Sequence, residues 1–277
     1  MKNMKADYHL HCQFSNDSSY PMEDVILDAI EMGLDEICFT DHVDYGVKFD
    51  VTPETEKDIP KSLRNVDYPQ YFAEIARLKE KYKDKIAIKA GLEFGVQMHT
   101  LQIYHELKEK WPLDFALLSV HEIDDLEFFR YTYQEGKTQQ QYNEGYYREL
   151  LKLVQNFQDY CVLAHMDLIV RYDRQGVYPF EKVKDLITEI LKVVIANGKG
   201  IEINTSSIRY GLSDTTPSRA ILELYHDLGG TIITIGSDSH RPGDLGSGIL
   251  QAKQILKEIG FKQFCTYENF KPIFHSL

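Results

Sequence analysis

Short apolar runs of β type alternate with amphipathic helical stretches along most of this 277-residue chain, and this alternation constrains its fold more than any other feature. The predicted strands lie at residues 5–9, 36–40, 86–92, 115–120, 161–164, 200–203 and 231–235. The predicted helices lie at residues 19–33, 69–82, 100–110, 139–157, 180–196, 217–228 and 245–259. Strands that alternate with helices over a whole chain indicate a parallel sheet with helical crossovers.

Residue types that bind metals follow the carboxyl ends of six of the seven predicted strands. In chain order they are His9 and His11, Asp41 and His42, Glu93, His121, His165, and Asp238 with His240. An open doubly wound sheet gathers its site at one switch point, whereas a (β/α) barrel collects residues from many strands on one face. We therefore predict an α/β fold of the TIM-barrel-like type, a (β/α)7 barrel, as a single domain over residues 1–277.

Composition narrows the class of protein. Hydrophobic residues make up 43% of the chain and charged residues 27%, as in an ordinary globular protein. Lys and Arg number 31 against 43 Asp and Glu, which gives a net charge of −12, and no long basic run is present. Tight binding to nucleic acid is therefore not expected.

No segment approaches the roughly 20 apolar residues that a membrane helix needs, and no apolar signal segment precedes the first predicted strand. We therefore expect a cytoplasmic protein that does not contact membranes. The oligomeric state stays open.

The four cysteines lie far apart in the sequence and form no C-x-x-C pair. A thiolate zinc site and a disulfide framework are both disfavoured by this spacing. We interpret Cys38 and Cys161 as core residues of strands, and only Cys12, next to His11, lies beside a candidate site.

The histidines carry the strongest functional signal. In His9-Leu10-His11 two imidazoles on one strand point to the same side and can hold one ion, although this motif alone is common. Six of the ten histidines follow predicted strand ends, where Glu93 and Asp238 add carboxylates. The other four lie in predicted helices or in the C-terminal tail and are interpreted as surface or capping residues: His99, His105, His226 and His275. A purely structural role for the first six would bury several ionisable groups without a balancing charge, so we predict a metal site.

Six short motifs resemble, in order, those of the polymerase and histidinol phosphatase (PHP) family. They are Asp7-Tyr8-His9-Leu10-His11, Phe39-Thr40-Asp41-His42, Gly91-Leu92-Glu93, Ser119-Val120-His121, Leu163-Ala164-His165 and Gly236-Ser237-Asp238-Ser239-His240. The resemblance spans essentially the full chain. Within the family, the chain length, the lack of polymerase domains and segment 164–172 look like the stand-alone L-histidinol phosphate phosphatases.

The resemblance implies a distorted seven-stranded barrel with three divalent metal ions, which would be zinc, manganese or iron. It implies a first ion held by His9, His11, Glu93 and Asp238, and a second held by Glu93, His121 and His165. The third would be held by His42, His240 and Asp17. Many members have a histidine in place of Asp17, and a carboxylate there favours a harder ion such as manganese. The alternative role of Asp17 is that of a helix-cap or turn residue.

The implied reaction is the hydrolysis of the phosphomonoester L-histidinol phosphate to L-histidinol and phosphate, a step of histidine biosynthesis, by a metal-bridging hydroxide that attacks phosphorus. The candidate catalytic residues are Glu93, Asp17 and His42, and the last two are candidate general acids if metal does not fully engage them. Asp41 and Asp167 are expected to orient ligand histidines. Two alternatives stay open: a PHP-type phosphoesterase acting on a nucleotide, short nucleic acid or phosphotyrosine, and a non-catalytic metal-binding module, which the complete ligand set disfavours.

Substrate-binding candidates follow from position on the expected catalytic face. Arg171 and Arg209 come after the fifth and sixth predicted strands, and either is a candidate for bidentate binding of phosphate, the alternative being a surface salt bridge. The long polar segment 43–67 follows the second strand and is expected on the same face, with Asp44 and Tyr45 as part of the substrate pocket.

Overall fold

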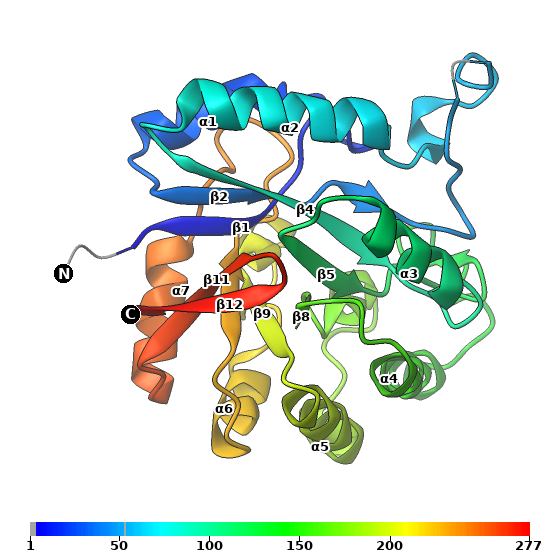
Figure 1. The fold of residues 1–277 in the computed structure, drawn as a ribbon. Helices are drawn as coiled ribbons and strands as arrows, with labels where there is room; N and C mark the ends of the chain where they lie inside the picture. Colours follow the sequence, from blue (N-terminus) through cyan, green and yellow to red (C-terminus); the bar gives the residue numbers. More distant parts are fainter. Residues whose placement is uncertain (1–3, 53) are drawn as a thin grey trace.

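The computed structural model describes residues 4–52 and 54–277, and its centre is a curved sheet of parallel strands surrounded by helices (Figure 1). Across the sheet the strands follow the order β1 (Ala6–Leu10), β2 (Glu36–Phe39), β4 (Ala87–Gly95), β5 (Phe115–Ser119), β8 (Val162–Leu163), β9 (Gly200–Asn204) and β10 (Ile233–Gly236). The short strand β3 (His42–Val43) pairs with the end of β4. Every neighbouring pair in this sheet is parallel, as predicted.

Backbone hydrogen bonds between the ends of β1 and β10 nearly close the sheet. The amide of Asp238 donates to the carbonyl of His9, and the amide of His11 donates to the carbonyl of Ser239, each at 2.7 Å. The fold is therefore the predicted distorted seven-stranded barrel, and its closure brings the last ligand motif of the sequence next to the first.

The barrel is irregular at its seam, the junction of β1 and β10, where a side chain replaces part of the backbone hydrogen bonding between strands. The carboxylate of Asp7 is fully buried and accepts hydrogen bonds from the amides of Ser237 and Gly246, each at 2.9 Å. Asp7 thus joins the two edge strands at a point where the regular backbone ladder is absent.

The seven predicted helices are all present and lie around the barrel (Figure 1). They are α1 (Met22–Glu31), α2 (Tyr68–Tyr82), α3 (Leu101–Lys110), α4 (Gln139–Asn156), α5 (Phe180–Ala196), α6 (Arg219–Asp227) and α7 (Ile249–Ile259). Three of them begin two or more residues later than predicted: α1 by three, α6 by two and α7 by four. Short 3-10 helices cover Lys61–Leu63, Leu168–Tyr172 and Ser206–Tyr210, all in loops after strands.

A C-terminal hairpin, β11 (Gln263–Glu268) and β12 (Lys271–Ser276), was not predicted, because we interpreted this region as a tail. It lies against the amino-terminal ends of the barrel strands (Figure 1). The amide of Tyr267 donates to the hydroxyl of Tyr8 at 2.8 Å, and the rings of Tyr267 and Phe115 lie 5.0 Å apart. Its turn contains Phe270 at φ 62°, a conformation that is rare for phenylalanine, so the residue type gave no indication of a turn.

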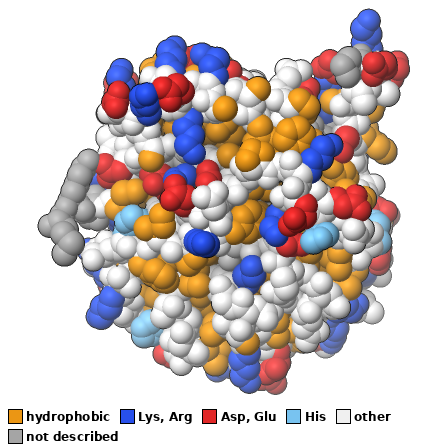
Figure 2. Space-filling view, viewed as in Figure 1, with side chains coloured by type: hydrophobic (Ala, Val, Ile, Leu, Met, Phe, Trp, Pro, Cys, Tyr) orange, Lys and Arg blue, Asp and Glu red, His pale blue; other side chains and the backbone are white. Residues whose placement is uncertain are grey.

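The four cysteines are buried and unpaired. Across residues 4–52 and 54–277, no helix has the length and apolar character needed to cross a membrane. On the face seen in Figure 2, Lys and Arg side chains are interspersed with Asp and Glu, without a continuous basic area. Location in the cytoplasm and the absence of nucleic-acid partners stay predictions.

Candidate metal centre

A cavity of about 690 Å³ opens at the carboxyl ends of the barrel strands. Seven of the nine predicted metal ligands line it: Asp17, His42, Glu93, His121, His165, Asp238 and His240. His9 and His11 are fully buried below them. The four histidines that we interpreted as surface or capping residues do not line the cavity.

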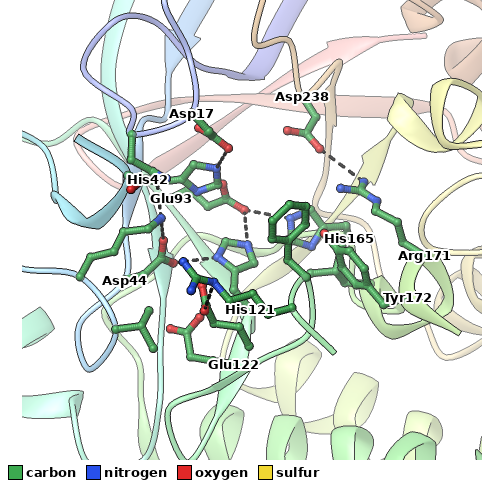
Figure 3. A pocket seen from close by; sticks show the side chains of 18 of the residues that line it. Asp17, His42, Asp44, Glu93, His121, Glu122, His165, Arg171, Tyr172 and Asp238 are labelled. Carbon is green, nitrogen blue, oxygen red and sulfur yellow. Dashed lines mark hydrogen bonds and ion pairs between the residues drawn. The ribbon is translucent and has the colours of Figure 1, made fainter. Parts of the chain in front are cut away.

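Glu93 lies at the centre of the cluster and divides its two oxygens between two groups of histidines (Figure 3). Oε1 lies 3.2 Å from His121 Nε2 and 2.8 Å from His165 Nε2. Oε2 lies 3.2 Å from His9 Nε2 and 2.9 Å from His42 Nδ1. This is the arrangement of a carboxylate that can bridge two ions.

The group predicted for the first ion is compact. His9 Nε2 and His11 Nε2 lie 3.2 and 3.5 Å from Glu93 Oε2. The same two nitrogens lie 3.6 and 3.5 Å from Asp238 Oδ1. Ligand atoms of a tetrahedral zinc ion, with bonds of about 2.0–2.1 Å, lie roughly 3.3–3.4 Å apart, so these separations fit a metal.

The group predicted for the third ion forms a triangle nearer the solvent. Asp17 Oδ2 lies 3.6 Å from His42 Nε2 and 3.4 Å from His240 Nε2. The two imidazole nitrogens are 3.4 Å apart. Asp17 is half exposed, and its carboxylate points at these two histidines rather than capping a helix.

Four buried ligand atoms at the centre have no hydrogen-bond partner among the described residues. They are His9 Nε2, His11 Nε2, His42 Nδ1 and Glu93 Oε2. Buried polar atoms without partners are costly, and here they all face one another. Bound cations would supply the missing partners, so the residues present fit a metal centre.

The histidines interact strongly with the two buried carboxylates of the cluster, as the pKa shifts of Glu93 and Asp238 indicate. Burial alone would raise the pKa of Glu93, but His9, His42 and His121 hold it well below its usual range. Burial would likewise raise the pKa of Asp238, yet His9, His11 and His240 hold it well below its usual value. Asp238 also adopts φ 56°, a backbone strain of the kind that concentrates at functional sites.

Three residues that sequence reasoning did not assign to this role support the ligand histidines. Glu202 Oε1 lies 2.7 Å from His9 Nδ1. Asp44 Oδ1 lies 2.7 Å from His121 Nδ1, and Ser15 Oγ lies 2.9 Å from His11 Nδ1. Such partners fix the orientation of a ligand imidazole. A signal for Glu202 existed, since it is a charged residue inside the apolar strand β9.

Two aspartates were predicted to orient ligand histidines. Asp41 does so indirectly: it accepts a hydrogen bond at 2.8 Å from the Ser15 hydroxyl, which in turn contacts His11. The prediction for Asp167 is wrong. Its carboxylate accepts a hydrogen bond from the amide of Ser218, and the Nδ1 atom of the nearby His165 has no hydrogen-bond partner among the described residues. Cys12 donates to Asp41 at 3.1 Å, and burial raises the pKa of its thiol, so it offers no thiolate to a metal.

The two candidate arginines differ in position. Arg171 lines the cavity, and its guanidinium stacks on the ring of Tyr210. Its Nη2 atom donates a hydrogen bond to Ser206 Oγ at 2.7 Å and lies 3.5 Å from Asp238 Oδ2. Arg209 does not line the cavity. Its Nη2 donates to the carbonyls of Ser237 and Asp238 at 2.6 and 2.9 Å, so it braces the backbone that carries Asp238.

Segment 43–67, predicted to lie on this face, contributes Asp44, Val47, Lys48 and Ser62 to the cavity wall. Tyr45 does not line the cavity and instead bonds to Asp50 and Tyr68. The β6–β7 hairpin, Glu122–Ile123 and Leu126–Glu127, contributes Glu122 and Glu127 to the wall on the side of Asp44, and Phe129, Arg130 and Tyr131 after it also line the cavity.

The model of the PHP domain family matches residues 7–206, which include seven of the nine predicted ligands. The chain belongs to the PHP family. Among curated proteins it is similar to the histidinol-phosphatase of Lactococcus lactis, with 33% identity over 96% of each chain. It is also similar to the histidinol-phosphatase of Bacillus subtilis, with 27% identity over 87% of this chain and 96% of the relative.

Among solved structures, this PHP-family chain is similar to the histidinol phosphate phosphatase of Lactococcus lactis complexed with zinc, L-histidinol and phosphate. The TM-score is 0.83 at 32% sequence identity, with 97% of this chain and 98% of that chain covered. A putative histidinol phosphatase from Listeria monocytogenes shares the fold, with a TM-score of 0.73, 20% identity, and coverage of 89% and 99%.

Proposed function

We propose that residues 1–277 form one PHP-type domain that hydrolyses L-histidinol phosphate to L-histidinol and phosphate. The observation that carries this proposal is the set of buried ligand atoms without partners that converge on Glu93. The similar Lactococcus lactis structure, which holds zinc, L-histidinol and phosphate, supports both the metal and the substrate.

Three divalent ions, which would be zinc, manganese or iron, would be held by three groups. The first group is His9, His11, Glu93 and Asp238, the second is Glu93, His121 and His165, and the third is Asp17, His42 and His240. Divalent ions at such a site lower the pKa of water and offset negative charge on phosphoryl oxygens. Glu93 would contribute to catalysis by belonging to both of the first two groups and so fixing their positions relative to each other.

Phosphate recognition by the protein itself falls to Arg171. Its guanidinium is largely buried and oriented by Ser206, and it faces the cavity, as the close-up shows (Figure 3). A planar, always charged guanidinium suits two phosphoryl oxygens. For Arg209 we replace the substrate-binding role with a positioning role, because its donors are directed at the backbone of Ser237 and Asp238.

The leaving group departs near Asp17 and His42 if the third group lies beside the ester oxygen. Although burial opposes it, the imidazoles of His42 and His240 hold the pKa of Asp17 far below its usual value. A carboxyl group so readily ionised is a poor proton donor. We therefore assign Asp17 to metal binding, and His42 can transfer a proton to the leaving oxygen only if one of its two ring nitrogens does not bind metal.

Phosphate release from a panel of phosphomonoesters by the metal-loaded protein tests this function. We expect the highest kcat/KM with L-histidinol phosphate and complete loss of hydrolysis with a chelator. If a nucleotide or phosphotyrosine is preferred instead, the chain is a PHP-type phosphoesterase of another specificity. If no ester is hydrolysed at full metal occupancy, the site binds metal without catalysis.

A further inference from the structure

Charged side chains gather on one wall of the cavity. It carries the carboxylates of Asp44, Glu122 and Glu127 and the cations of Lys48 and Arg130. Lys48 contacts Asp44, and Arg130 Nε lies 2.7 Å from Glu127 Oε2. Each of these cations is therefore engaged with an acid other than Glu122.

Glu122 has no comparable partner in the described part of the chain. Its side chain lines the cavity, the residue is only 1% exposed, and its Oε1 atom has no hydrogen-bond partner among the described residues. The neighbouring His121 directs its ring nitrogens to Asp44 and Glu93. A buried carboxylate that lacks a partner inside a cavity indicates that a ligand supplies one.

The β6–β7 hairpin places a second carboxylate close to Glu122. In the antiparallel pair of β6 and β7, Glu122 lies directly opposite Glu127. Residues directly opposite in an antiparallel pair share one face, and like charges there repel each other. The nearby charged groups that act on Glu122 are Asp44, Lys48, His121 and Glu127. A cationic group from a ligand would relieve the repulsion.

We propose that Glu122 binds the ammonium group of the substrate and thereby selects phosphate esters of 2-amino alcohols. This inference rests on the proposed function. In L-histidinol phosphate the ammonium group is on the carbon next to the ester methylene, so it lies close to the phosphate. Glu122 directly follows the ligand His121 and lies on the side of the cavity that holds Asp44, across from Arg171 (Figure 3). The two sides of the cavity therefore match the opposite charges of such a substrate.

The imidazole of the substrate is a weaker candidate for this contact. An imidazole is mostly neutral at pH 7, whereas an aliphatic ammonium group is charged there. The ammonium also lies closer to the phosphate along the carbon chain. Glu122 would therefore determine which phosphate ester is accepted, while Arg171 and the metal ligands act on the phosphate common to all of them.

The test compares two substrates in the metal-loaded protein: L-histidinol phosphate and the analogue with hydrogen in place of the amino group. In Glu122→Gln the ratio of their kcat/KM values should fall by about 10- to 150-fold, as for the loss of one charge-assisted hydrogen bond. Glu127→Gln is the matched control, because Arg130 already pairs with that carboxylate, and its ratio should change less than about 3-fold. Glu122→Asp, which keeps the charge on a shorter side chain, should retain part of the selectivity and serves if the Gln variant does not fold.

Metal content is measured for every variant, since Glu122 adjoins a ligand. If Glu122→Gln lowers kcat/KM equally for both substrates, or the Asp and Gln variants both keep the wild-type ratio, Glu122 does not bind the ammonium group. Failure of the proposed function is recognised separately, from the wild type alone. A wild-type protein that does not hydrolyse L-histidinol phosphate overturns the proposed function, whereas one that hydrolyses the analogue equally well overturns only the role of Glu122.

Discussion

Replacing Arg171 by Ala should weaken catalysis without loss of metal. The guanidinium is held by a 2.7 Å hydrogen bond to Ser206, stacks on Tyr210 with its central carbon 3.9 Å from the ring centre, and faces the cavity. It is therefore preorganised, and little side-chain entropy is lost when it binds phosphate.

The size of the effect follows from the bonds that are removed. A charge-assisted hydrogen bond to phosphate is worth roughly 1.5–3 kcal/mol, which corresponds to about a 10- to 150-fold loss in kcat/KM. Arg171→Lys should recover only part of this loss, because an ammonium group offers a point charge rather than a planar pair of donors. The loss should be the same for L-histidinol phosphate and for an aryl phosphate, since both present the same phosphate.

Arg209→Ala is the matched control for this experiment. Arg209 donates to the carbonyls of Ser237 and Asp238, so its removal loosens the backbone that carries a metal ligand. We expect this variant to lose bound metal and to recover activity when excess metal is added. Steady-state kinetics with metal analysis of both variants separates the two roles.

Two outcomes would contradict the roles assigned to Arg171 and Arg209. If Arg171→Ala stays within about 3-fold of wild-type kcat/KM at full metal content, phosphate recognition does not involve Arg171. If Arg209→Ala instead loses kcat/KM at unchanged metal content, Arg209 contacts the substrate, and the roles that we assign to the two arginines are reversed.

Three further predictions concern the metal centre and the seam of the barrel. Glu93→Gln should lower bound metal by more than one equivalent per chain, because its two oxygens face two ligand groups, and metal analysis showing a loss of one equivalent or less would contradict bridging. Burial alone would lower the pKa of His42, but Asp17 and Glu93 raise it to about 10, so at neutral pH metal must displace a proton there. Metal affinity should therefore rise up to about tenfold per pH unit between about pH 6 and 8, and titrations at two pH values that give equal affinities would refute this. Asp7→Ala leaves one buried and one partly buried amide without an acceptor and should lower the free energy of unfolding by about 2–4 kcal/mol, whereas a loss below about 0.5 kcal/mol in urea unfolding would show that the seam does not depend on it.

The amino-acid sequence by itself predicts the barrel and the ligands that follow its strands, whereas Asp17 and the division into three groups are implied only by the resemblance to the PHP family. Alternation of strands and helices implies parallel strands, and the carboxyl ends of parallel strands share one face. Any metal-binding residue type just after a strand is therefore brought to that face, whatever the details of packing. This is why His9 and His240, which are 231 residues apart, could be assigned to one site before their distance was known.

Tertiary structure decided the features that depend on which way a side chain points and what it meets. Arg171 and Arg209 look equivalent in the sequence, but one faces the cavity and the other faces the backbone below it. Only the folded chain pairs Lys48 with Asp44 and Arg130 with Glu127, so that neither cation is paired with Glu122. Pairing between charges is a property of distances across the fold, and sequence periodicity carries no information about such distances. The identity of the ligands was therefore a local property of the sequence, whereas selection among substrates depends on contacts that only the folded chain creates.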